Sequence, residues 1–183
     1  MENRKALFEK NTLEFVTVTL EFCALMEATD RHTLFEFVDK GVKIIPLLYL
    51  KAAMLPTVED PEEADELDYF ITEETYEVIR ARLATLLGEH DSYLETFHPD
   101  IEYSDTPIAT TISENLADVY QDLGNFVALF RQENETVMRQ ALYACNENFR
   151  LYWGQKLLNA LRAIHSVRFS DEIQYSPEDD DNE

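Results

Sequence analysis

The sequence predicts an all-α fold: an antiparallel helical bundle of about six or seven helices, followed by an acidic C-terminal tail. Only four glycines and six prolines punctuate 183 residues, and such scarce breakers favour long helices over a many-turned β-sandwich. Apolar residues recur at helical spacing, and no strand-like alternation is sustained. Helices of this length joined by shorter connections pack as antiparallel bundles.

The length fits one domain, which we place at residues 1–169. Hydrophobic residues make up 45% of the chain, as is typical of a globular protein. Residues 170–183 are rich in acids and contain Pro177, so this segment is expected to be a disordered tail.

The formal net charge is −22, and the acids of residues 170–183 account for seven of these charges. The rest of the chain is therefore also strongly acidic. Such a surface repels the phosphates of nucleic acids and anionic membranes, so neither is expected as a partner. It would suit a protein partner with a basic surface, although acidic surfaces most often serve solubility.

The cysteine content and the lack of an apolar signal peptide favour a cytoplasmic location. The two cysteines, Cys23 and Cys145, lie within helical apolar patterns and do not form a disulfide framework. The start of the chain is charged and lacks the apolar run of a signal peptide. No stretch approaches about 20 uninterrupted apolar residues, the length that a membrane-spanning helix needs.

Two helices are predicted in the first third of the chain. The first covers Thr12 to about Ala28, with Asn11 or Thr12 as its N-cap. The second covers residues 32–54, with Pro46 in its middle. Proline cannot donate a backbone hydrogen bond and crowds the preceding turn, so a kink or break is expected there.

The central part of the chain predicts a connection and then a third helix. Residues 55–71 form the connection, either as a surface loop or with a short helix around 62–69. Thr72 caps the third helix. That helix either ends at Gly88 or continues through it to Phe97.

The last part of the chain predicts a long fourth helix and a bent helical run. Pro107 starts the fourth helix, which reaches about Gln132, because proline is well tolerated at the first helical position. Asn134 caps the run that follows. This run is too long for one typical helix, so a bend is expected at residues 146–148 or at Gly154.

Three acids at four-residue spacing, Glu114, Asp118 and Asp122, are the first candidate for a metal site. Stacked carboxylates on one helical face could hold a hard cation. At ~100° per residue, however, all three lie outside the apolar arc of their helix. We therefore interpret them as a solvent-exposed face.

His90 and Asp91 are the second candidate. An adjacent His-Asp pair on a helix is the centre of the metal site in HD-type phosphohydrolases, which also need an earlier histidine, here His32, and a later aspartate, here Asp118 or Asp122. If the third helix continues through Gly88, His90 falls inside its apolar arc and Asp91 outside it. This divergence favours a buried structural histidine over a shared metal.

His98 could extend this candidate. Its separation from His90 does not match the spacing of three or four that helical zinc motifs use. Pro99 breaks the helix before Asp100, so that acid is expected to serve a turn. A loop-built site with His90, Asp91 and His98 nevertheless remains open, with a divalent metal as its cofactor.

Other enzyme signatures are weaker. Glu62–Glu66 matches only the first half of the EExxE and ExxD pattern of helical nucleotide pyrophosphatases, and no second half follows. Glycine loops for phosphate, a GxSxG turn and a dinucleotide fingerprint are all missing from the sequence. Neither Cys23 nor Cys145 has basic neighbours in sequence that would mark it as reactive.

Several stretches resemble a bacterial family known as a domain of unknown function, of the all-helical 5063 type. They are "FEFVDKGVKIIPLLYLKA" (Phe35–Ala52), "EEADELDYFITEETYE" (Glu62–Glu77), "LLGEHDSYLETFHPDIEYSDTPIATTISENLADVYQDL" (Leu86–Leu123) and "YWGQKLLNALRAIHS". The resemblance covers nearly the whole chain apart from the acidic tail. It implies an intracellular bacterial protein of helical fold, and it assigns no activity or site residue.

Two functions are carried forward. The preferred hypothesis is a non-enzymatic acidic helical adaptor or regulator that binds another protein and needs no cofactor. The alternative is a metal-dependent hydrolase with its site around His90, Asp91 and His98. A third and weaker idea is mimicry of nucleic acid by the acidic surface.

Overall fold

The structure, a computed structural model, describes residues 2–59, 67–95 and 108–173. These residues form a mostly helical domain, which confirms the predicted all-α class. The elements in chain order are α1 (Glu2–Phe8), α2 (Lys10–Glu27), the 3-10 turn η1 (Thr29–Arg31), α3 (Leu34–Ala53), α4 (Glu73–Leu87), the 3-10 turn η2 (Gly88–His90), β1 (Ser92–Leu94), β2 (Ala109–Thr111), α5 (Ile112–Phe130), α6 (Glu135–Asn148), the π-helix η4 (Phe149–Trp153) and α7 (Gly154–Arg168).

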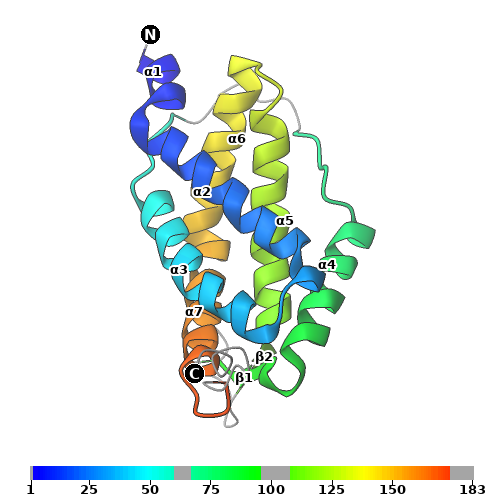
Figure 1. The fold of residues 1–183 in the computed structure, drawn as a ribbon. Coiled ribbons are helices and arrows are strands. Elements are labelled where there is room, and N and C mark those ends of the chain that lie inside the picture. Colours follow the sequence, from blue (N-terminus) through cyan, green and yellow to red (C-terminus); the bar gives the residue numbers. More distant parts are fainter. Residues whose placement is uncertain (1, 60–66, 96–107, 174–183) are drawn as a thin grey trace, which may run out of the picture.

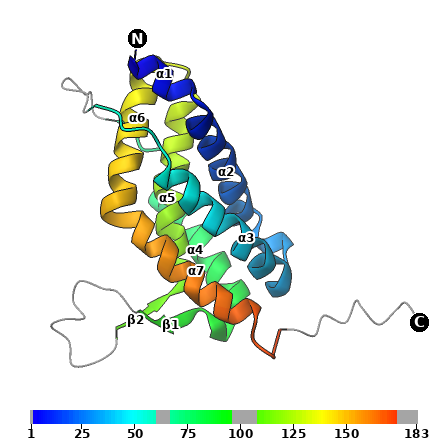
Figure 2. The same ribbon diagram turned by 90° about the vertical axis from the view of Figure 1, so that its left-hand side faces the viewer.

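The long helices alternate in direction along the bundle, as predicted. Figure 1 shows α2 descending, α3 rising, α4 descending and α5 rising, before α6 and α7 descend together. Figure 2 shows the bend between α6 and α7, and the small β1–β2 ribbon beside the lower part of α7. The ribbon was not predicted from the sequence.

α5 is the central element of the core. It packs against α2, α4, α6 and α7, and its apolar side chains Leu116, Val119 and Leu123 are fully buried. Aromatic rings extend this core, since Phe126 lies 5.4 Å, centroid to centroid, from both Phe15 and Phe130. Offset or tilted ring pairs of this kind add to the free energy gained from burying apolar area.

The first helix begins earlier than predicted. α1 and α2 run together from Glu2, and Glu9 lies at the N-cap of α2 without a side-chain capping bond. Thr12, predicted as a cap, is instead fully buried, and its hydroxyl donates to the carbonyl of Ala6 at 2.6 Å. This bond ties the two helices together where they meet.

α3 begins with a capping box that was not predicted from the sequence. The Thr33 hydroxyl accepts from the backbone N–H of Glu36, whose carboxylate accepts from the backbone N–H of Thr33 at 2.8 Å. The two side chains satisfy free N–H groups of the first turn. Pro46 does not break the helix, which continues to Ala53.

α4 begins as predicted. Of the two predicted ends, at Gly88 or at Phe97, the structure has the first. The Thr72 hydroxyl accepts from the N–H of Thr75 at 3.1 Å, which confirms the cap. Gly88 ends the helix with φ +54° and ψ −125°, a conformation essentially closed to residues with a Cβ. The helix therefore does not reach Phe97, and β1 follows instead.

β1 and β2 form an antiparallel ribbon in which Tyr93 pairs with Thr110. The chain then enters α5 directly, and the hydroxyl of Thr111 caps that helix by accepting from the N–H of Glu114 at 3.2 Å. The predicted start at Pro107 is therefore wrong by five residues. Pro107 itself lies outside the described residues.

The bend in the last helical run is a π-helix, and it lies between the two positions predicted for a bend, directly before Gly154. Asn134 caps α6 through bonds to the N–H groups of Thr136 and Val137. In η4, the N–H of Gly154 donates to the carbonyl of Phe149, the wide i→i+5 bond of a π turn. A Cβ on Gly154 would lie 2.4 Å from that same carbonyl oxygen, so the turn requires glycine.

No helix among residues 2–59, 67–95 and 108–173 is long and apolar enough to cross a membrane. α7 ends at Arg168, and turns lead to Ile173. Most of the predicted disordered tail, residues 174–183, lies outside the described residues, and so do residues 60–66 of the predicted acidic connection.

Replacing Gly154 by alanine should lower the free energy of unfolding by about 1–3 kcal/mol, the usual cost of overfilling a tightly packed position. The reason is the close approach of the Phe149 carbonyl. Urea denaturation followed by circular dichroism measures the change. The neighbouring exposed Gln155→Ala should stay within about 0.5 kcal/mol of the wild type, and equal stability of the two variants would contradict the requirement for glycine.

Candidate functional site

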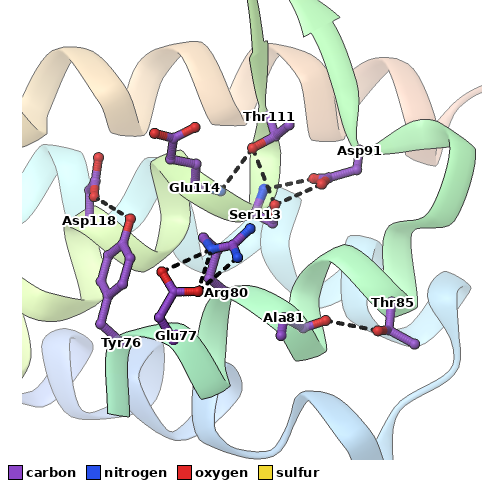
Figure 3. Close-up of polar contacts among 10 residues, drawn as sticks. All are labelled: Tyr76, Glu77, Arg80, Ala81, Thr85, Asp91, Thr111, Ser113, Glu114 and Asp118. Atoms are coloured by element: carbon purple, nitrogen blue, oxygen red, sulfur yellow. Dashed lines mark hydrogen bonds and ion pairs between the residues drawn. The ribbon is translucent and has the colours of Figure 1, made fainter. Parts of the chain in front are cut away.

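Asp91 is buried and caps the start of α5. Its side chain is 8% exposed. One carboxylate oxygen accepts from the backbone N–H of Ser113 at 2.8 Å, and the other accepts from the Ser113 hydroxyl at 2.7 Å (Figure 3). A carboxylate at the positive N-terminus of a helix is favourably placed. Asp91 therefore fixes the ribbon against α5.

This arrangement corrects the predicted orientations of His90 and Asp91. On a helix continued through Gly88, the sequence predicted His90 on the buried side and Asp91 outside it. The positive φ of Gly88 ends that helix, so the helical wheel no longer applies. Asp91 is buried, whereas His90 is partly exposed.

His90 lines a cavity of about 400 Å³ between the ribbon and α7. The ribbon side is formed by η2 and by all three residues of β1, and the helix side is formed by successive turns of α7. Polar side chains come from both sides, together with the apolar side chains of Leu94, Ala163 and Val167. The lining comprises Glu89, His90, Ser92, Tyr93, Leu94, Asn159, Arg162, Ala163, Ser166, Val167 and Ser170.

A second cavity of about 470 Å³ lies farther along the same helix. Its lining comprises Glu95, Ile108, Ala109, Thr110, Glu114, Asn115, Leu151, Tyr152, Gln155, Lys156 and Asn159. Asn159 borders both cavities, and its amide donates to the Glu95 carboxylate at 2.8 Å. We call the two cavities together the α7 groove.

A partly buried network of polar groups borders the second cavity. Asp118 of α5 is 9% exposed. It accepts from the hydroxyls of Tyr76 at 2.8 Å and Tyr152 at 3.1 Å, and it forms a salt bridge with Lys156. Four elements therefore meet at one carboxylate: α4, α5, η4 and α7.

The network holds its groups in fixed protonation states. Burial alone would lower the pKa of Lys156, but the hydrogen bond and charge of Asp118 outweigh it and raise the pKa. Burial, followed by the hydrogen bond to Asp118, raises the pKa of Tyr76. Burial and the charge of Asp118 likewise raise the pKa of Tyr152. At neutral pH, therefore, Lys156 is a cation and both tyrosines are neutral.

The solvent-exposed interpretation of the acid series was correct for Glu114 and wrong for Asp118. Figure 3 shows both side chains projecting from α5 to the same side, yet only Asp118 reaches the tyrosine and lysine partners. Asp122 is partly buried and accepts from the amide of Asn148 at 2.7 Å. Burial raises the pKa of Asp122.

The metal hypothesis concerns His90, Asp91 and His98, of which His90 and Asp91 lie in the described part of the chain. Within the described part of the chain, no group of three histidines, cysteines or acids could hold a metal ion. Each carboxylate oxygen of Asp91 accepts one hydrogen bond from Ser113, whereas His90 lines the first cavity, and a metal site with His90 and Asp91 stays a prediction. His98 and Asp100 lie outside the described residues, and a site that includes His98 stays a prediction.

The other residues considered for catalysis are the two cysteines and an acidic segment. Cys23 and Cys145 are buried free thiols. Burial raises the pKa of Cys23 to about 12 and that of Cys145 well above its ordinary value. Both thiols are therefore protonated and poorly nucleophilic at neutral pH. Glu62–Glu66 lies outside the described residues.

The groove and its supporting network define a class: an acidic all-α domain with a polar groove between a helix and a β-ribbon. The chain belongs to the family described as "Domain of unknown function (DUF5063)", whose model matches residues 6–170. This confirms the resemblance seen in the sequence.

A crystal structure of protein BF1032 from Bacteroides fragilis is similar to this chain. The two are 44% identical with a TM-score of 0.80, and the match covers 90% of this chain and 96% of that one. No curated protein matches the chain.

Asp122→Asn and Asp118→Asn should change stability in opposite directions at pH 7, although the two residues lie one turn apart on α5. Asp118→Asn leaves the half-buried Lys156 without its counter-ion, which should cost about 2 kcal/mol. Asp122→Asn removes a charge that burial disfavours and keeps an oxygen that can accept from Asn148, so it should stabilise the protein.

The pH dependence follows from the raised pKa of Asp122. Ionisation of this carboxyl costs folding free energy above its folded pKa, and that cost disappears as the pH falls towards the ordinary value of 3.8. The advantage of Asp122→Asn should therefore shrink between pH 7 and pH 4 in urea titrations. A constant or negative effect would contradict the assignment.

Proposed function

We propose that the protein is a non-enzymatic acidic adaptor that binds a basic segment of another protein in the α7 groove. The observation that carries this proposal is the pair of carboxylates, Glu95 and Glu114, that line the second cavity in a chain of net charge −22, while the cation in the same lining, Lys156, is paired with Asp118. Fields of one sign attract oppositely charged partners and speed their association. A cytoplasmic partner is part of this proposal.

The character of the groove supports binding. The exposed side chains of Leu151 and Tyr152, which are 81% and 45% accessible, lie at its rim on η4. Leu94 of β1, at 62%, borders the first cavity. Apolar and aromatic side chains beside carboxylates suit the aliphatic stems and charged ends of lysine and arginine.

The protonation states around the groove also favour binding over chemistry. Lys156 is held as a cation by Asp118, and the hydroxyls of Tyr76 and Tyr152 donate to the same carboxylate. A nucleophile or general base needs a pKa near the working pH. The pKa values of Lys156 and of both tyrosines are raised further above neutral pH, so these groups are not suited to either role.

Glu95→Gln combined with Glu114→Gln should weaken binding of a fluorescent oligolysine peptide by about three- to tenfold, as expected for two partly exposed charges. Fluorescence anisotropy at low and moderate salt measures this, and wild-type binding should weaken as salt screens the charges. Glutamine keeps the hydrogen-bond acceptor that Glu95 offers to Asn159, so the fold is preserved.

The matched control is Glu21→Gln, which removes one charge from an exposed position on α2 and is compared with Glu95→Gln and Glu114→Gln measured singly. If Glu21→Gln weakened binding as much as each groove substitution does, the attraction would be general and the groove would not be the site. If the wild type bound no oligolysine even at low salt, the proposed function would be wrong.

A further inference from the structure

The β1–β2 ribbon has an outer edge whose backbone groups are directed away from its partner strand. Backbone bonds join Ile112 to Asp91 and Glu95 to Ile108, and the register is antiparallel with Ser92 opposite Thr111 and Leu94 opposite Ala109. Hydrogen-bonded and non-hydrogen-bonded pairs alternate in such a ladder. Ser92 and Leu94 therefore belong to non-bonded pairs and present their N–H and C=O groups outward.

This edge borders the first cavity of the α7 groove. All three residues of β1 line that cavity, and Arg162 and Ser166 of α7 line it too. In the described residues the sheet contains only β1 and β2. An open edge beside a cavity is the geometry in which an extended peptide adds to a sheet as a new strand.

We propose that the outer edge of β1 receives an extended segment of the basic partner as a third strand. This inference rests on the proposed function and names how that partner is recognised. Backbone groups of the incoming segment pair with those of Ser92 and Leu94, while its side chains alternate between the cavity and the outside. Small polar side chains fit beside Ser166, and basic side chains fit the outer positions.

The charges at the ends of β1 favour a basic segment over a second copy of this chain. Glu89 precedes the strand and Glu95 follows it, and both line the groove. A second copy paired antiparallel about Ser92 would place its Glu89 opposite Glu95. Like charges directly opposite destabilise a strand pair, and the net charge of −22 adds to the repulsion. A basic segment meets complementary charge at both ends.

The opposite edge is less suited to the same role. β2 leads directly into α5, and Thr111 is the N-cap of that helix. Its carbonyl therefore begins the helical hydrogen-bond ladder and is not available to a strand. Ala109 is left as the residue of β2 with both backbone groups directed outward, whereas β1 offers both Ser92 and Leu94.

The test uses Leu94→Pro and Ala109→Pro, two residues that face each other in the ribbon. Each substitution removes an outward N–H without removing a ribbon hydrogen bond, the position in which a strand tolerates proline. The probe is a synthetic peptide of alternating lysine and threonine. Leu94→Pro should weaken its binding by about fivefold or more, the effect of one net hydrogen bond. Ala109→Pro, at a residue that lines the second cavity but lies on the opposite edge of the ribbon, should weaken binding clearly less.

Leu94→Ala controls for the loss of the leucine side chain and should bind more tightly than Leu94→Pro. Equal binding by Leu94→Pro and the wild type would overturn the inference, and so would an equal loss in Leu94→Pro and Ala109→Pro. Circular dichroism and thermal unfolding establish that each variant is folded.

A second arm uses the wild-type protein and therefore does not depend on any variant folding. The peptide is N-methylated either at every lysine or at every threonine, which blocks the N–H groups on one edge of an extended strand or on the other. One methylated peptide should lose binding and the other should keep it. Equal binding of both would overturn the strand inference while leaving the adaptor function intact. Failure of the unmethylated peptide to bind at low salt would count against both.

Discussion

The Asp118 carboxylate joins four elements of the bundle at one point. It lies on the central helix α5 and accepts hydrogen bonds from Tyr76 and Tyr152 and a salt bridge from Lys156. A carboxylate that is almost completely buried is stable only when such partners replace its lost hydration. The positions of α4, η4 and α7 relative to α5 therefore depend on this junction, and so does part of the lining of the second cavity of the α7 groove.

Local chemistry made parts of the fold predictable. Thr72 and Asn134 were identified as caps because a cap depends on a side chain and the backbone two or three residues later. The bend near Gly154 was also found, since the run was longer than a typical helix. The pattern T-x-x-E at Thr33 carried an equally local signal that was overlooked.

The candidate site was less predictable because it depends on contacts between distant segments. His90, a candidate from the sequence, lines the first cavity, but its neighbour Asp91 caps a helix that begins more than twenty residues later. The helical wheel of α5 gives the angle of Asp118 from the apolar stripe. It does not show that α4 and α7 pack against that side of α5, nor that Tyr76 and Lys156 bond to the Asp118 carboxylate.

The π-helix between α6 and α7 has a consequence for how this fold tolerates changes in length. A π turn accommodates one more residue than an α turn, so η4 takes up one extra residue without changing the rotational phase of the residues that follow. Deleting one residue there would restore a regular helix and keep Lys156 beside Asp118 and Asn159 beside Glu95. Deleting one residue between Lys156 and Asn159 would instead rotate the rest of α7 by ~100° and take Asn159 away from Glu95. Within this fold, a single-residue deletion in residues 149–153 is therefore expected to be tolerated better than one inside α7.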